Sequence, residues 1–232
     1  MKYATLIAFG LFAAHISCGQ KMEYSIHLNS GGAAYRGSGA SRASSILVAD
    51  IVEVPAYTNN PYGKRLGFCY GLAGQIQRIT PKHSVFGVQA GYEVLQSRIA
   101  ITEVYGFRSV NPAASGHTTL TNKTINVHPF FGHRLALKSV DVDAQLGPEL
   151  GVILSAREKG EATLQGQEYS TDAERSHPSI DFRARLQLTA YYKRAGLSAG
   201  YSRGLTNYYA GYDGSTSSVY SQVFRLGLAY RI

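Results

Sequence analysis

The stretch that decides the fold is Phe224-Arg225-Leu226-Gly227-Leu228-Ala229-Tyr230-Arg231-Ile232. Every even position carries a large apolar side chain, and every odd position carries a small or cationic one. Strict alternation of this kind is typical of a β-strand with one apolar and one polar face. In an outer-membrane barrel the last strand must close on the first and present its outer face to lipid. We therefore expect this apolar, aromatic-bearing segment to close such a barrel against Tyr24, Ile26 and Leu28.

The same alternation recurs in seven further segments, so the sequence predicts an all-β protein. Between residues 65 and 78, for example, Leu66, Phe68 and Tyr70 point to one face while Cys69 and Gln75 point to the other. The eight predicted strands cover residues 23–35, 65–78, 86–94, 122–137, 141–154, 180–190, 197–204 and 224–232. We expect an eight-stranded antiparallel transmembrane up-and-down β-barrel.

The connections between these strands alternate in length. Those between strands two and three, four and five, and six and seven are tight, whereas four long ones lie near residues 36–63, 103–121, 157–177 and 207–218. Short turns on one rim and long loops on the other are typical of an even-stranded outer-membrane barrel. Residues 46–54 are too apolar for a solvated loop, and we expect them to extend the barrel wall or form a loop hairpin. A ten-stranded barrel is the structural alternative.

The beginning of the chain predicts export. Lys2 precedes an apolar run over residues 4–14, and Ser17 and Gly19 occupy the −3 and −1 positions of a cleavage site before Gln20. We expect residues 1–19 to be a signal peptide and residues 20–232 to be the barrel domain, located in the cell outer membrane. A lipoprotein signal acylated at Cys18 is the competing interpretation. No long apolar stretch follows, which excludes a helical membrane protein.

Composition supports this class and limits the partners. The chain has 25 Gly, 17 Tyr, no Trp and 16% charged residues, which suits membrane strands with a polar lumen. Its formal net charge of +8 does not indicate nucleic-acid binding, because the cations are spread out rather than clustered with aromatic residues. We expect the cations at the rims to meet outer-membrane lipid and lipopolysaccharide phosphates. These cations include Lys64, Arg65, Arg98, Lys123, Arg157 and Arg203.

The inward positions of the predicted strands carry charges of both signs. They are Glu93, Asp141, Asp143, Glu149, Asp181, Arg134, Arg183, Arg185, Arg225 and Arg231. An eight-stranded barrel is only wide enough for side chains to fill, and an unpaired buried charge is costly. We therefore expect these charges to pair across the lumen, with a conducting pore as the alternative.

Fragments of catalytic chemistry are present but incomplete. Ser25 lies two residues from His27, His128 and Glu149 share the lumen, and His133 has a serine nearby. Since a nucleophile needs a base that a third group orients, the sequence predicts no enzyme and no catalytic residue. A lipid A-modifying enzyme remains an alternative. Scattered histidines, the lack of paired cysteines and the lack of a phosphate-binding Gly-rich loop predict no cofactor and no metal site.

Aromatic residues gather near the predicted outer ends of the strands. They are Tyr57, Tyr62, Tyr105, Phe107, Tyr208, Tyr209, Tyr212 and Tyr220. We interpret them as an interfacial aromatic girdle, with a surface for a ligand or partner as the alternative.

Four segments resemble the PorT-like outer-membrane β-barrel proteins, in the order found there. They are Gln89-Ala90-Gly91-Tyr92-Glu93-Val94-Leu95-Gln96-Ser97-Arg98, His128-Pro129-Phe130-Phe131, Leu146-Gly147-Pro148-Glu149-Leu150-Gly151 and Tyr201-Ser202-Arg203-Gly204-Leu205-Thr206-Asn207. His128 departs from the small aliphatic residue that commonly precedes the proline. The resemblance implies an integral outer-membrane barrel without a shared catalytic motif, inserted by the barrel-insertion machinery. It also suggests a component of a secretion apparatus with secretion-system proteins as partners, as an alternative to a structural or binding protein whose loops serve recognition.

Overall fold

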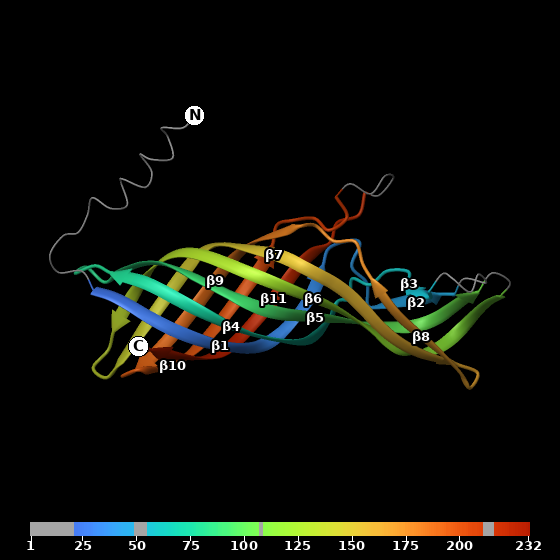
Figure 1. Ribbon diagram of the computed structural model, residues 1–232, viewed down its shortest axis with the longest axis horizontal. Coiled ribbons are helices and arrows are strands. Elements are labelled where there is room, and N and C mark those ends of the chain that lie inside the picture. The colour runs from blue at the N-terminus through green and yellow to red at the C-terminus, as the bar shows by residue number, and fades with distance from the viewer. Residues whose placement is uncertain (1–20, 49–54, 107–108, 211–215) are drawn as a thin grey trace, which may run out of the picture.

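The computed structural model describes residues 21–48, 55–106, 109–210 and 216–232. The predicted signal peptide, including Cys18, lies outside these residues, as do residues 49–54 of the apolar segment in the first connection. The described residues form β-strands and their connections, arranged as an elongated barrel (Figure 1). No helix in this part of the chain is long and apolar enough to cross a membrane.

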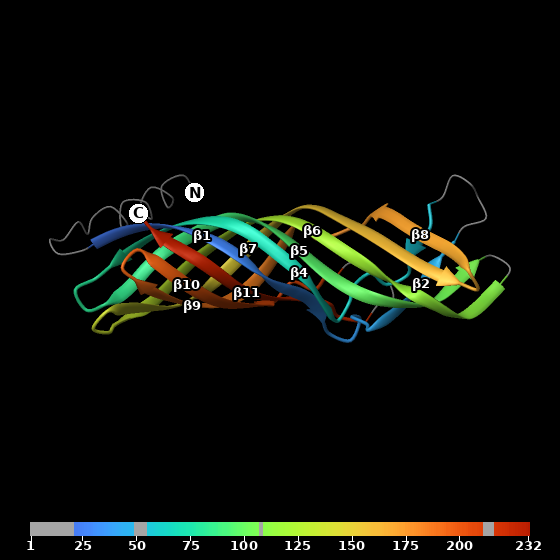
Figure 2. The same ribbon diagram turned by 90° about the horizontal axis from the view of Figure 1, so that it is seen from below.

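Eight of the strands form a closed ring. They are β1 (Lys21–Arg36), β4 (Arg65–Ile79), β5 (Ser84–Gly106), β6 (Ser109–Ala136), β7 (Val140–Leu164), β9 (Ile180–Tyr192), β10 (Ala195–Gly204) and β11 (Tyr220–Arg231). Each pairs antiparallel with the next ring strand along the chain, and β11 pairs antiparallel with β1 (Figure 2). The predicted ring of eight strands is confirmed.

The segment that ends the chain forms the closing seam. Leu228 lies opposite Leu28, and Tyr230 lies opposite Ile26. The backbone N–H of Ile232 donates to the carbonyl of Tyr24 at 2.9 Å, so the pairing continues to the last residue. The expected contact between the first and last strands is confirmed.

Side chains of the ring follow the period of two that a pleated strand imposes. In β11, Leu226 and Leu228 are 65% and 59% exposed, whereas Arg225 and Ala229 are 3% and 5% exposed. Every ring strand presents large apolar side chains outward in this way. Examples, one from each strand in ring order, are Leu28, Phe68, Phe86, Phe131, Leu150, Leu188, Leu197 and Leu226. The barrel is therefore apolar outside and polar inside.

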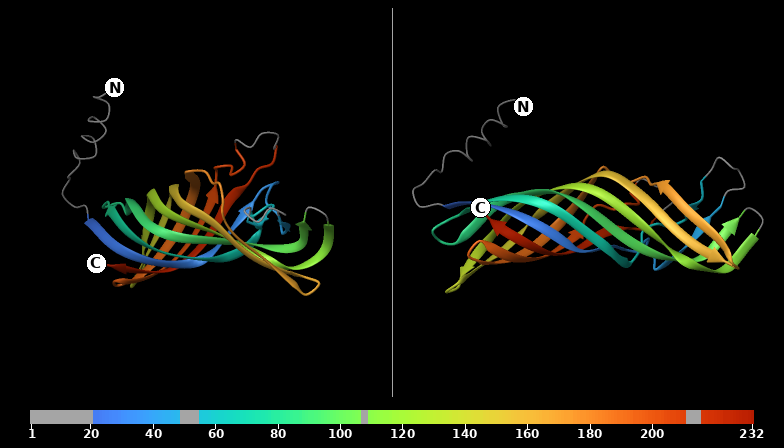
Figure 3. Two further views of the ribbon diagram at one scale, coloured as in Figure 1. Left: turned by 45° about the vertical axis from the view of Figure 1, so that its right-hand side comes forward. Right: turned by 60° about the horizontal axis from the view of Figure 1, so that its bottom comes forward.

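Two of the predicted long loops are wrong. Residues 103–121 belong largely to β5 and β6, and residues 157–177 belong largely to β7 and to β8 (Gln167–Glu174), which pairs antiparallel with β7. These strands continue past the ring as an extension of the wall, at the end of the barrel away from the C-terminus (Figure 3). The physical reason is an apolar core inside the extension. Its buried members are Ile46, Ile99, Ile101, Val104, Ala114, Ala162 and Leu164.

The first connection also contributes to the extension. β2 (Ala43–Leu47) pairs parallel with β5, and β3 (Tyr57–Thr58) pairs antiparallel with β2. The sheet as a whole is therefore mixed, although the ring is antiparallel. Of residues 46–54, only residues 46–48 are described; Ile46 and Leu47 lie in β2 and extend the wall beside β5, which agrees with the first of the two expectations, a wall extension or a loop hairpin. The ten-stranded alternative is wrong, because β2 joins the sheet by pairing with β5 and β3 pairs with β2, so that neither strand enters the ring.

Closure places one glycine where no other residue fits well. Gly31 has a φ of +153°, and a Cβ built on it would lie 2.0 Å from the carbonyl oxygen of Phe224 on β11. We expect Gly31→Ala to lower the free energy of unfolding by about 1–3 kcal/mol, because the backbone must shift at the closing seam. Guanidinium unfolding of the refolded protein in detergent micelles measures this loss.

Gly74 is the matched control, because a Cβ there has no heavy atom within 4 Å. Gly74→Ala should change the free energy of unfolding by less than about 0.5 kcal/mol. Equal losses in the two variants would contradict the role of Gly31.

Candidate functional site

The lumen holds the densest group of charged side chains, in two clusters along the barrel axis. The first cluster lies toward the extension. Glu149 accepts hydrogen bonds from Arg183 Nη1 at 2.8 Å and from Arg225 Nη2 at 2.8 Å. Arg225 Nε also donates to Glu93 at 2.7 Å, and Arg183 Nε donates to Asp181 at 2.7 Å. All these side chains are buried.

The second cluster lies near the start of β1 and the end of β11. Arg134 pairs with Glu23 at 2.8 Å and with Asp143 at 2.6 Å. Arg231 pairs with Glu23 at 3.1 Å and with Asp141 at 3.2 Å. Glu23 was missing from the residues predicted to be inward. Its position could have revealed it, because alternation with Tyr24 outward places Glu23 inward.

These contacts confirm that the predicted inward charges pair with one another. In the first cluster, Arg185 completes a balance of three carboxylates and three guanidinium groups, with its Nη1 3.6 Å from Glu149. Burying a charge away from water destabilises the folded state unless the charge is paired and hydrogen-bonded in this manner. The clusters therefore join strands on opposite sides of the lumen.

A group of tyrosines closes the extension end of the lumen. The rings of Tyr35, Tyr62 and Tyr208 pack edge to face, with centroids 5.0 to 5.7 Å apart. Each of these rings is about 5% exposed or less. The girdle interpretation is therefore wrong for Tyr62 and Tyr208, because their rings are buried inside the barrel, where the Tyr208 hydroxyl donates to Asp181 of the first charge cluster at 2.9 Å. Of the same predicted set, Tyr57 is 38% exposed.

Three further aromatic residues of that set are half-buried in the structure. They are Tyr105, Tyr209 and Tyr220. Tyr105 donates a hydrogen bond to Glu103, and the ring of Tyr209 packs edge to face on that of Tyr62. Phe107 and Tyr212 lie outside the described residues.

Ser25 and His27 do meet within the lumen. Ser25 Oγ lies 3.0 Å from His27 Nε2, and His27 is fully buried. The other ring nitrogen, Nδ1, has no hydrogen-bond partner among the described residues. The pair therefore lacks the orienting group that a nucleophile and its base require.

The other histidine fragments do not assemble. His128 and Glu149 share the lumen as expected, but no hydrogen bond joins them in the described residues, and His128 Nδ1 contacts the carbonyl oxygen of Pro148 at 2.9 Å instead. The two carboxylate oxygens of Glu149 already accept hydrogen bonds from Arg183, Arg225 and Ser202. His133 lies opposite Ser84 in the β5–β6 ladder and is exposed. Among the described residues, no group of three or more His, Cys, Asp or Glu side chains is placed to hold a metal ion.

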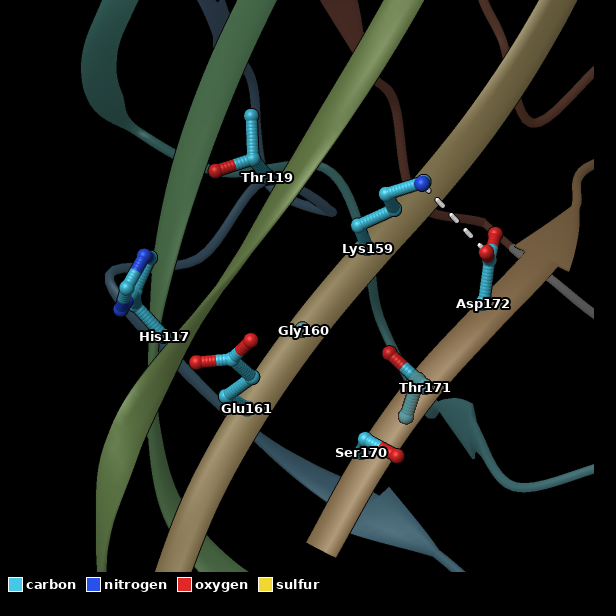
Figure 4. Close-up of a pocket in the computed structure, with 8 residues that line it drawn as sticks. All are labelled: His117, Thr119, Lys159, Gly160, Glu161, Ser170, Thr171 and Asp172. Carbon is cyan, nitrogen blue, oxygen red and sulfur yellow. Dashed lines mark ion pairs between the residues drawn. The ribbon is translucent and has the colours of Figure 1, made fainter.

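The extension carries an open groove on β6, β7 and β8, shown in Figure 4. His117 and Glu161 lie on one side of it, and the ion pair of Lys159 with Asp172, 3.5 Å long, lies on the other. The groove has polar walls and is formed largely by exposed side chains. Sequence reasoning missed these residues because it assigned residues 103–121 and 157–177 to loops.

One carboxylate of the extension is buried without full compensation. Glu158 is 0% exposed, accepts a hydrogen bond from the backbone N–H of Thr58 at 2.7 Å, and lies 3.5 Å from Arg175. Burial raises the pKa of Glu158 above its usual value, against the opposing effect of these two contacts. This residue links β3 to β7 and so holds the first connection against the extension.

Comparison with known proteins finds no family profile and no curated protein that matches the chain. Among solved structures, Neisserial surface protein A is 11% identical, with a TM-score of 0.32 over 90% of this chain and 97% of that one. The translocator domain of the autotransporter NalP from Neisseria meningitidis is 12% identical, with a TM-score of 0.33 over 100% of this chain and 95% of that one.

The central carboxylate of the lumen should be essential for stability. We expect Glu149→Gln to lower the free energy of unfolding by about 3–5 kcal/mol, because it removes one partner of a buried ion-pair network and leaves arginine charge uncompensated. Glu161→Gln, at an exposed position on the same strand, is the control and should change it by less than about 0.5 kcal/mol. Chemical unfolding in micelles measures both, and a Glu149→Gln protein as stable as the control would contradict the role of the network.

Glu158 should make the docking of β3 depend on pH. A carboxyl group whose pKa is raised on folding stabilises the folded state fully below its ordinary pKa, about 4.3, and this stabilisation is lost as the pH rises through the folded pKa. We expect the Thr58 amide to exchange with solvent faster, after correction for intrinsic rates, as the pH rises from about 4. Glu158→Gln should abolish this dependence and Glu161→Gln should retain it, whereas a dependence that survives in Glu158→Gln would refute the assignment.

Proposed function

We propose that the protein is an integral outer-membrane β-barrel with a structural or binding role and no catalysis of its own. The observation that carries this proposal is the apolar outer surface of all eight ring strands. Phe68 and Leu226, at 57% and 65% exposure, are typical of it. Soluble proteins rarely expose contiguous apolar surface of this extent, whereas a barrel in lipid requires it.

The strand lengths and the closed ring support a transmembrane placement. On β4 the outward apolar side chains run from Leu66 to Ile76, and on β9 they run from Ile180 to Ala190, which is eleven residues in each case. About 9–11 tilted residues suffice to cross the hydrocarbon core. Because the ring is closed, its strands leave no unpaired backbone edge toward lipid.

The two ends of the barrel differ, and this difference supports one orientation of the barrel across the membrane. Tight turns join β4 to β5, β6 to β7, and β9 to β10 at the end where β11 finishes, and we place this end in the periplasm. The extension with β2, β3 and β8 then faces the exterior. Its polar groove over β6, β7 and β8 offers a surface for recognition.

The narrower alternatives have less support. The PorT-like resemblance motivates the proposal of a secretion-apparatus component, whose partners would bind through the extension or the periplasmic turns. A lipid A-modifying activity is less well supported, because the Ser25–His27 pair lies buried in the lumen and lacks an orienting acid among the described residues.

Heat-modifiable migration tests the proposal. We expect the full chain, produced in a Gram-negative host, to fractionate with the outer membrane and to migrate differently on a denaturing gel before and after boiling, because a closed barrel resists detergent unfolding. A protein that remains in the soluble fraction and migrates identically in both states would overturn the proposal.

Orientation is tested in the same cells by cysteine labelling. Native Cys69 is buried, whereas Ser170 in the extension and Lys82 in a tight turn are exposed. A membrane-impermeant maleimide should label Ser170→Cys in intact cells and label Lys82→Cys only after lysis. The reverse pattern would invert the orientation.

A further inference from the structure

Five cations gather on the outer surface where the ring meets the extension. We call them the basic cluster, and they are Arg36, Arg42, Lys64, Arg65 and Arg98. They come from the end of β1, the first connection, the start of β4 and the middle of β5. Only three of them, Lys64, Arg65 and Arg98, were among the rim cations predicted to meet phosphates. Arg36, at the end of β1, and Arg42, in the first connection, join them only in the folded structure.

Strand pairing and hydrogen bonds to the backbone hold these residues together. Arg65 and Arg98 are direct partners in the β4–β5 ladder. Arg36 Nη1 donates to the carbonyl oxygen of Lys64 at 2.7 Å, and the N–H of Lys64 donates to the carbonyl oxygen of Ser41 at 2.8 Å. The carbonyl oxygen of the next residue, Arg42, accepts from the N–H of Ala100 at 3.2 Å, two residues beyond Arg98 on β5.

Within the part of the chain that the structure describes, no carboxylate compensates the charge of the basic cluster. Among the described residues, none of the five cations forms an ion pair with a carboxylate. In contrast, the buried arginines of the lumen all have carboxylate partners, and exposed Arg157 pairs with Asp172. Like charges directly opposite each other on neighbouring strands are destabilising, so the Arg65–Arg98 pair favours an anion between its guanidinium groups.

The position of the cluster indicates what kind of anion it binds. Leu66 and Phe68, 54% and 57% exposed, follow Arg65 along β4, and the ring of Phe68 stacks on that of Tyr70 with centroids 6.0 Å apart. The cations therefore stand at the edge of the apolar outer surface. A ligand that fits both parts has phosphate groups joined to acyl chains.

We propose that the basic cluster is a binding site for the phosphate groups of a phosphorylated glycolipid of the outer leaflet, whose acyl chains lie on Leu66, Phe68 and Tyr70. The site rests on the proposed function, because it requires the apolar surface of β4 to face lipid. The paired guanidinium groups of Arg65 and Arg98 donate to the phosphate oxygens. Lys64, Arg36 and Arg42 add positive charge around them.

The test compares lipid binding to the folded full-length barrel in detergent micelles, measured by native mass spectrometry. The probes are lipopolysaccharide, the same lipid after enzymatic removal of its phosphates, and inorganic phosphate. We expect wild-type protein to retain lipopolysaccharide and to lose most of this retention with the dephosphorylated lipid. The double variant Arg65→Gln/Arg98→Gln should bind lipopolysaccharide about 30-fold more weakly, since each cation near a membrane surface contributes a factor of about five.

The control is Lys82→Gln/Lys138→Gln, which removes two exposed cations from the opposite end of the barrel and should bind like wild type. If Arg65→Gln/Arg98→Gln does not fold, as judged by heat-modifiable migration, Arg42→Gln/Lys64→Gln takes its place, because neither residue lies in a ring strand. Equal lipid retention in the cluster variant and the control would overturn the site. Saturation by inorganic phosphate as readily as by the lipid would overturn the lipid assignment.

These outcomes are distinguishable from failure of the proposed function. If the wild-type protein does not enter the outer membrane or shows no heat-modifiable migration, both proposals fall. If it inserts and migrates as expected but binds phosphorylated and dephosphorylated lipid equally, only the basic cluster loses its role.

Discussion

Closure of the backbone ladder between β1 and β11 is the constraint on which the rest of the structure depends. An open sheet of this size would leave a row of unpaired N–H and C=O groups along two edges. The pairing of Leu28 with Leu228 and of Ile26 with Tyr230 removes both edges. The close backbone approach at Gly31 is one local consequence of this closure.

Closure also dictates the chemistry of the interior. Once the strands form a ring, every second side chain points into a lumen only wide enough for side chains, so polar residues there must satisfy one another. Arg225 and Glu149 meet at 2.8 Å although they lie 76 positions apart in the chain. The same alternation places apolar residues on the outside, and both faces of the barrel follow from one period of two.

Some parts of the candidate sites were accessible to sequence reasoning and others were not. The inward charges were predictable because parity along a strand determines which face a side chain occupies, and Glu23 could have been found by the same rule. The partner of each charge was not predictable, as the contact of His128 with Pro148 in place of Glu149 illustrates. Register and strand tilt determine which inward side chains reach each other, and the alternation of apolar and polar residues predicts neither of them.

By itself, the sequence determined the all-β class, the eight ring strands and the sides on which their residues lie, because these depend on local periodicity. Only the tertiary structure decided that residues 103–121 and 157–177 continue as strands, since their stability comes from the core shared by Ile46, Ile101 and Leu164. Likewise, only the tertiary structure places Arg36 and Arg42 beside Arg65 and Arg98. Contacts between segments so distant in the chain arise from packing, which no local pattern records.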